Sequence, residues 1–107
     1  MAVTYELYLE PAVHQARKEL PGKVRQRVRR HLEALAGRPR PRDSRRLETS
    51  SIQLAPGVEV RRIRIDRWRI VYAVNDAECW VWVLGIYRRP PYDYEDLAGL
   101  ADRLPRT

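Results

Sequence analysis

The chain has 107 residues, 44% of them hydrophobic, which fits one domain over residues 1–107 with a single core. Lys and Arg number 21 against 14 Asp and Glu, so the net charge is +7. Apolar residues are spread along the whole chain, which excludes wholesale disorder. Two separate domains are excluded as well, because each would be too small to enclose a core.

The cysteine count and the N-terminal sequence indicate the cellular compartment in which the protein is expected. A single thiol, Cys79, excludes an internal disulfide framework, and with only two histidines no structural zinc site is expected. The opening sequence MAVTYELYLE lacks a secretory signal pattern, and no apolar run approaches the roughly 20 residues that span a bilayer. We therefore expect a cytoplasmic protein in a reducing compartment, with no membrane contact and no cofactor or metal.

The positive charge is carried almost entirely by arginine. Only Lys18 and Lys23 are lysines, so 19 of the 21 basic residues are arginines. The planar guanidinium grips phosphate or carboxylate through two parallel hydrogen bonds. A small, strongly basic domain therefore favours a polyanion or an acidic protein as its partner, although a GC-rich genome would raise the arginine count by itself.

The first half of the chain predicts a strand followed by two helices. Residues 3–9 alternate and are rich in Tyr, Val and Leu, as in a strand, and Pro11 suits the first position of a helix. Apolar residues then recur at helical spacing on both sides of Pro21-Gly22, and the second run stops near Gly37. This second helix is amphipathic and basic. Residues 38–46, RPRPRDSRR, predict an exposed loop that is solvated or touches phosphates.

The second half predicts a sheet. Residues 58–65, 68–74 and 79–86 are three β-rich runs with short polar breaks, which indicates a three-stranded antiparallel meander. Residues 93–104 have apolar residues at helical spacing after an acidic start, so a short C-terminal helix is expected. The predicted fold class is therefore α+β, with an N-terminal strand and a helical hairpin packed on an antiparallel β-sheet.

Strand parity predicts which side chains share a face of the meander. A tight turn at Asp66-Arg67 would pair Arg64 with Arg69, leaving an apolar face for the core and a second face with the arginines. A further turn at Asp76-Ala77 would place Val81 and Val83 in the core. That turn adds five residues to the arginine face: Trp80, Trp82, Leu84, Ile86 and Arg88.

Two questions about the predicted meander have more than one answer: the alternation of its first strand and the partner of its arginine face. Val58 and Val60 are out of phase with the core residues of the same strand, which suggests a bulge near Arg61 or Arg62, or a strand that starts only at Arg61. The mixture of arginines and large apolar side chains suits a protein partner or a nucleic acid. A terminal helix or loop of this same chain would cover the two tryptophans equally well.

In its element order and in two strings, VRRIRIDRWRIVYAVND and VLGIYRRPPYDYEDL, the chain resembles the RelE/ParE superfamily of toxins from bacterial type II toxin-antitoxin systems. The family pattern has an Arg-x-Arg strand, an aromatic-Arg pair, an apolar-apolar-Tyr strand, and a basic residue followed by a tyrosine. The matching positions are Arg62 and Arg64, Trp68-Arg69, Ile70-Val71-Tyr72, then Arg88 with Tyr92 or Tyr94.

The resemblance implies a toxin that is neutralised by an acidic cognate antitoxin, for which we expect contacts at Trp80, Trp82 and Leu84. RelE-like members cut mRNA in the ribosomal A site and so inhibit translation, whereas ParE-like members poison DNA gyrase without a known hydrolytic site. We expect a RelE-like, metal-independent endoribonuclease (an mRNA interferase) acting on the ribosome. The alternatives are a gyrase inhibitor that is not an enzyme, and a degenerate toxin that acts only with its antitoxin in operator binding.

Cleavage of RNA needs a base for the 2'-hydroxyl proton, cations for the charged phosphorane, and an acid for the leaving oxygen. The resemblance implies catalytic roles for Arg69, Arg88, Tyr92 and Tyr94, and RNA phosphate binding by Arg62, Arg64 and Arg89. RelE-like enzymes often carry Lys at the positions of Arg62 and Arg64, and arginine is a poor base at neutral pH. The base is left open among Glu59, Asp93 and Glu95.

Each of these residues also has an ordinary structural interpretation. Arg69 would pair with a C-terminal carboxylate, and Tyr92 and Tyr94 would cap the sheet at a rigid Pro-Pro corner. His14 and His31 are interpreted as helix-surface or core-edge residues.

Overall fold

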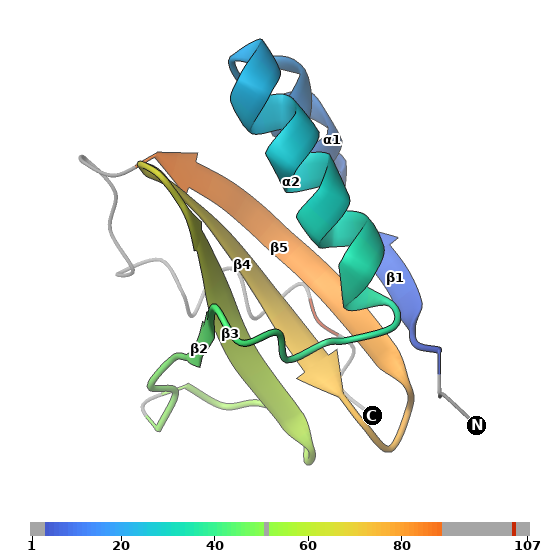
Figure 1. The fold of residues 1–107 in the computed structure, drawn as a ribbon. Coiled ribbons are helices and arrows are strands. Elements are labelled where there is room, and N and C mark those ends of the chain that lie inside the picture. The colour runs from blue at the N-terminus through green and yellow to red at the C-terminus, as the bar shows by residue number, and fades with distance from the viewer. Residues whose placement is uncertain (1–3, 51, 89–103, 105–107) are drawn as a thin grey trace.

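The computed structural model describes residues 4–50, 52–88 and 104. These residues form a sheet with two helices on one of its faces, as Figure 1 shows. The elements in chain order are β1 (Glu6–Leu9), α1 (Pro11–Lys18), α2 (Gly22–Leu35), β2 (Ser44–Arg46), β3 (Val58–Ile65), β4 (Trp68–Asn75) and β5 (Trp80–Arg88).

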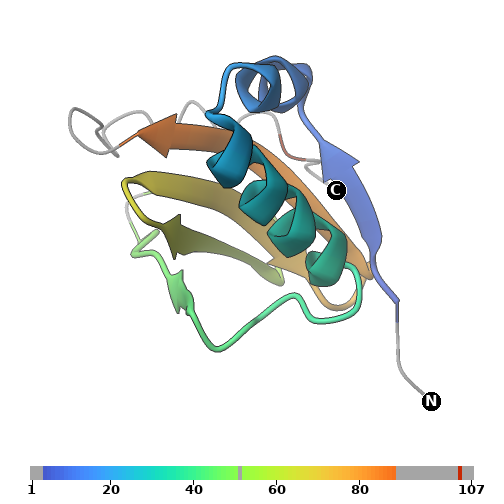
Figure 2. The ribbon, with the colours of Figure 1, turned by 45° about the horizontal axis from the view of Figure 1, so that its top comes forward.

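The sheet has the order β1-β5-β4-β3-β2. Strands β3, β4 and β5 form the predicted antiparallel meander, β2 pairs antiparallel with β3, and β1 pairs parallel with β5. The parallel pair requires a crossover, which α1 and α2 begin by carrying the chain over one face of the sheet from β1 to the opposite edge (Figure 2). Strands β2, β3 and β4 then lead back to β5 beside β1. This arrangement confirms the α+β fold class, with a helical hairpin packed on the meander.

The core lies between the helices and the sheet, and we call this side of the sheet the helix face. Helix residues with almost no exposure, such as Val13, Val28 and Leu35, pack there against Ile63, Ile70 and other strand residues. The helical spacing of the former and the strand alternation of the latter place both sets on the surfaces that meet. The predicted turn is also confirmed, because Ile65 pairs with Trp68 and Arg64 with Arg69.

The prediction that Ile86 and Arg88 lie on the arginine face is wrong, because strand β5 contains a bulge. Val83 pairs with Tyr72 and Gly85 with Val71, so Leu84 is an extra residue in the ladder. Beyond it the alternation is inverted. Ile86 belongs to the core under the helices, and Arg88 lies opposite Trp68 on the helix face.

The expected irregularity in β3 is absent from the described ladder, which runs without a register shift from Val58 to Ile65. Val58 and Val60 are out of phase with the core because they serve a second apolar cluster on the opposite face of the sheet. There they pack with Val71, Ala73 and other residues: Trp80, Leu84, Leu104, Leu47, Ile52, Leu54, Trp82 and Tyr87. We call this side the open face, since neither described helix covers it (Figure 2).

Two further predictions concern the loop and the C-terminus. The segment 38–46 is not wholly an exposed loop, because its last three residues form the edge strand β2 and Ser44 is buried. A three-residue strand has too few alternations to be seen in a sequence, and it exists through its pairing with β3. The C-terminal helix predicted over 93–104 lies outside the described residues except for Leu104, which is buried in the open-face cluster.

Candidate nucleic-acid interface

Strand β3 divides its three arginines between the two faces of the sheet. Arg61 pairs with Tyr72 in the ladder and shares the helix face with it. Arg62 pairs with Val71 and Arg64 with Arg69, so both project from the open face. This split creates two different polar regions, one on each side of the same strand.

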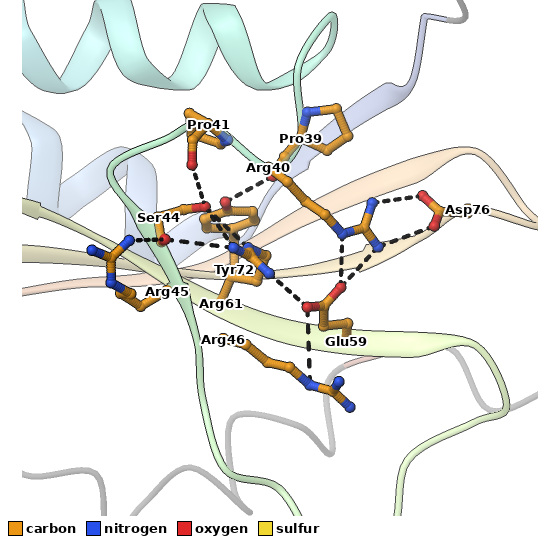
Figure 3. A network of polar contacts seen from close by, with 10 residues as sticks. All are labelled: Pro39, Arg40, Pro41, Ser44, Arg45, Arg46, Glu59, Arg61, Tyr72 and Asp76. Carbon is orange, nitrogen blue, oxygen red and sulfur yellow. Dashed lines mark hydrogen bonds and ion pairs between the residues drawn. The ribbon is translucent and has the colours of Figure 1, made fainter.

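On the helix face, Arg61 belongs to an ion-pair network with Glu59 and Asp76 (Figure 3). Arg40 donates from Nη1 and Nη2 to the two carboxylate oxygens of Asp76, each at 3.0 Å, and from Nε to Glu59 Oε2 at 2.8 Å. Arg61 donates to the other oxygen of Glu59 at 2.6 Å. Asp76 therefore has one arginine partner, whereas Glu59 has Arg40 and Arg61 and, at 3.9 Å from its Oε1, the Nε of Arg46.

The network also fastens the segment between α2 and β2 to the sheet. The hydroxyl of buried Tyr72 donates to the carbonyl of Pro39 at 2.8 Å, and Ser44 Oγ donates to the carbonyl of Pro41 at 2.7 Å. Arg61 in turn donates from Nε to Ser44 Oγ at 3.0 Å. Figure 3 shows these bonds converging beside Tyr72. Because they hold Ser44, they also determine where the next residue, Arg45, stands.

The electrostatics of the network follow from its pairing. Burial raises the pKa of Glu59, but the hydrogen bonds and charges of Arg40 and Arg61 outweigh burial and leave that pKa below its usual range. Hydrogen bonds from Arg40 and Tyr5 lower the pKa of Asp76. A carboxylate held ionised in this way makes a poor general base, and Glu59 moreover lies on the opposite face from Arg62 and Arg64.

On the open face, three arginines surround a hollow of about 280 Å³ that is lined by Asp43, Arg45, Arg62 and Arg64. Arg45 of β2 lies directly across the ladder from Arg62. Neither Arg62 nor Arg64 has a carboxylate partner within the described part of the chain. Among the same residues, Arg45 donates only to the backbone carbonyls of Arg42 and Ser44. We call this set the arginine hollow. Its excess of positive charge suits a phosphate chain.

Arg69 adjoins the arginine hollow but is held differently. It lies opposite Arg64 in the ladder, is only 4% exposed, and donates from Nη1 to the carbonyls of Trp68 at 3.1 Å and Asp66 at 3.4 Å. These bonds brace the β3–β4 turn. Its role as a transition-state contact stays a prediction.

Next to Arg69, Tyr87 occupies the same face and lies over Gly85. A Cβ atom at Gly85 would come within 2.3 Å of the Tyr87 hydroxyl oxygen, so the Tyr87 ring can occupy this position only because residue 85 is a glycine. The sequence alone does not place Tyr87 on this face, because its position depends on the bulge at Leu84.

The structure brings the predicted site residues together only in part. Arg62, Arg64 and Arg69 share the open face, whereas Arg88 starts from the helix face at the same end of the sheet. Arg89, Tyr92 and Tyr94 lie outside the described residues. Arg45 is an addition that the sequence did not reveal, because its segment has the composition of a loop.

The predicted antitoxin contacts lie in and beside the open-face cluster. Leu84 and Trp80 are buried, and Leu104 of the same chain belongs to their cluster. Trp82 stacks on Tyr8 with ring centroids 5.0 Å apart and donates from its indole nitrogen to Glu10 at 2.7 Å. Segments of this chain thus contribute to covering these side chains, and their contact with an antitoxin stays a prediction.

Among residues 4–50, 52–88 and 104, no group of three or more His, Cys, Asp or Glu side chains is placed to hold a metal ion. Neither α1 nor α2 is long and apolar enough to cross a membrane.

No family model and no curated protein matches the chain. Solved structures do. A chain of the archaeal RelE-RelB complex from Pyrococcus horikoshii OT3 is similar, with 24% identity and a TM-score of 0.69 over 83% of this chain and 99% of that one. A chain of the RelBE2 toxin-antitoxin complex from Mycobacterium tuberculosis has 19% identity and a TM-score of 0.62, over 81% and 100%.

The free toxin shows the same likeness. A mutant of the E. coli toxin RelE in the free state has 19% identity and a TM-score of 0.57, over 94% of this chain and 96% of that chain. Because toxins from an archaeon and two bacteria all superimpose on the strand order and helical hairpin described above, the chain has the fold of the RelE toxins.

Proposed function

We propose that this chain is the toxin of a toxin-antitoxin pair and that it cuts messenger RNA on the ribosome without a metal ion. The observation that carries the proposal is the arginine hollow. On a RelE-like fold, Arg45, Arg62 and Arg64 stand together with Asp43 as the single acid in their lining. An acidic antitoxin is the proposed inhibitor, in keeping with the net charge of +7.

In the proposed reaction the 2'-oxygen of one nucleotide attacks the adjacent phosphorus and its proton passes to a base. The bond to the 5'-oxygen breaks as an acid protonates that oxygen, which leaves a 2',3'-cyclic phosphate and a free 5'-hydroxyl. Charge accumulates on the phosphorane oxygens, and guanidinium groups stabilise it. Arg62 and Arg64 would hold that phosphate, with Arg45 on the flanking one. Arg69 is the proposed transition-state contact, and Tyr92 and Tyr94 are the proposed acid–base or base-stacking groups.

The decisive experiment is to induce the protein alone in a bacterial host and to follow amino-acid and thymidine incorporation in parallel over minutes. Amino-acid incorporation should fall first, with cleaved messages, while thymidine incorporation continues. Co-expression of the antitoxin should restore growth.

Two variants link this result to the arginine hollow. The Arg62→Ala/Arg64→Ala variant should lose the arrest, and Arg46→Ala, an exposed neighbour on the helix face, should keep it. Early loss of thymidine incorporation with a DNA-damage response would instead identify the gyrase alternative. Unchanged growth, or arrest that persists in the double variant, would overturn the proposal.

A further inference from the structure

A second cationic recess lies on the other side of the sheet, at the end where β3 turns into β4. It is a notch of about 400 Å³ between the start of α2, the β3–β4 turn and the end of β5. Its lining is apolar on one wall and charged on the other: Pro21, Val24, Trp68, Asp66, Arg67 and Arg88.

The bulge at Leu84 builds the notch. Without the extra residue, Arg88 would project from the open face; with it, Arg88 lies directly across the ladder from Trp68. Directly opposed residues on one face have Cβ atoms about 5 Å apart, so the guanidinium reaches the indole easily. Trp68 is half-buried, with its inner part packed on the core.

The charge balance of the notch is positive. Its one acid, Asp66, is already paired with Arg27 of α2 at 2.6 Å. Arg67 and Arg88 are exposed, and neither has a carboxylate partner among residues 4–50, 52–88 and 104. Two guanidinium groups therefore remain available beside an aromatic ring.

We propose that the notch binds one nucleotide of an RNA strand, with the base on Trp68 and its phosphate against Arg67 and Arg88. An aromatic face stacks any base, and guanidinium groups hold the phosphate as a bidentate partner. The apolar wall of Pro21 and Val24 suits the face or edge of a base. A volume of about 400 Å³ falls within the range of small-ligand sites.

This inference rests on the proposed function, since both assume that the chain binds RNA, and it adds the path of the strand. Arg64 and Trp68 belong to neighbouring residue pairs on opposite faces, next to the β3–β4 turn. An RNA strand whose phosphates meet Arg62 and Arg64 would pass round this turn to place a neighbouring nucleotide in the notch. The notch would then orient the strand relative to the arginine hollow.

The test uses tryptophan fluorescence, because Trp68 reports on its own ligand. The full chain is titrated with AMP, with adenosine and with inorganic phosphate. AMP should quench the emission, and Trp68→Phe should abolish the quenching. Arg88→Ala, which retains the fluorophore, should weaken AMP binding about tenfold, while Arg46→Ala should leave it unchanged. Adenosine and phosphate should each bind more weakly than AMP.

Several results would overturn the inference: no quenching in the wild type, equal quenching in Trp68→Phe, or phosphate binding as tightly as AMP. A labelled RNA 10-mer separates this failure from that of the proposed function. If the 10-mer binds the wild type and Arg88→Ala equally, and binding is lost in Arg62→Ala/Arg64→Ala, the notch is wrong and the arginine hollow stands. If the 10-mer does not bind at all, the notch is wrong, and the incorporation experiment decides the proposed function separately.

Discussion

The two faces of strand β3 carry arginines of the same kind in opposite electrostatic situations. On the helix face, Arg61 shares Glu59 with Arg40, and Arg40 also pairs with Asp76. On the open face, Arg62 and Arg64 follow Arg61 by one and three residues, and neither has a carboxylate partner in the described part of the chain. Glu59, the one acid within strands β2, β3 and β4, thus lies on the helix face.

This difference separates arginines that stabilise the fold from arginines that are available to bind a ligand. An arginine whose charge is met by a carboxylate stabilises the fold and has little attraction left for a phosphate. An arginine without a partner contributes little to folding and retains its full attraction for an anion. The net charge of +7 does not reveal which arginines are paired with carboxylates and which are available to an anion. Substitutions on one face should therefore change its property and leave that of the other face intact.

The largest effect is expected from emptying the arginine hollow. Arg62→Ala and Arg64→Ala should each slow RNA cleavage about 100-fold if they contact the phosphorane, with the free energy of unfolding nearly unchanged. Measuring RNA affinity at several salt concentrations would also count the phosphate contacts that each variant loses. The slope of log K against log[salt] should become shallower by about 0.7 for each lost phosphate contact on a single strand.

Arg46→Ala is the matched control for these variants, because Arg46 is exposed on β2 and lies only 3.9 Å from Glu59 on the other face. An equal loss of slope in Arg46→Ala would mean that RNA affinity reflects general charge, and the contrast between the faces would fail.

The next effect is on stability, from breaking the helix-face network. Glu59→Gln removes the shared acid of Arg40 and Arg61, and Arg61 is only 15% exposed in its side chain. We expect the free energy of unfolding to fall by about 2 kcal/mol, because a largely buried guanidinium loses its ionic hydrogen bond. Urea unfolding measures this. Glu33→Gln, which loses an exposed pair with Arg29, should change stability by less than about 0.5 kcal/mol.

The same network predicts a dependence on pH. The pKa values of Glu59 and Asp76 are lowered in the folded protein from their ordinary values of 4.5 and 3.8. Their contribution to stability is therefore complete above the ordinary values and is lost as the pH falls through the lowered ones. Unfolding followed between pH 6 and pH 2, on the order of the window in which carboxyl groups titrate, should show a decline that is smaller in Glu59→Gln/Asp76→Asn. An identical decline in that variant would refute the assignment.

The smallest effect is expected at the exposed ion pair between Arg27 and Asp66. Asp66 has a positive φ of 53°, a conformation that Asn tolerates well, so Asp66→Asn removes the charge with little backbone strain. The free energy of unfolding should fall by about 0.5 kcal/mol or less, since both side chains are largely exposed. A loss above about 2 kcal/mol in urea unfolding would show that this pair, too, is structural.

Local patterns in the chain were sufficient for much of the fold. The meander, the Asp66-Arg67 turn and the face of Arg62 and Arg64 follow from alternation, which depends only on neighbouring residues. Helical spacing similarly determined which sides of α1 and α2 pack on the sheet. For the candidate site, the chain by itself identified Arg62 and Arg64 of β3 and the turn that places Arg69 opposite Arg64.

Tertiary structure alone decided the rest. The extra residue at Leu84 leaves no mark in an alternating apolar run, because either face accepts an apolar side chain here, yet it moved Ile86 and Arg88 to the helix face. Strand β2 exists only through its pairing with β3, and that pairing brought Arg45 to the hollow. The partners of Arg40 lie 19 and 36 residues away, so its neutralisation depends on long-range proximity that no local pattern encodes.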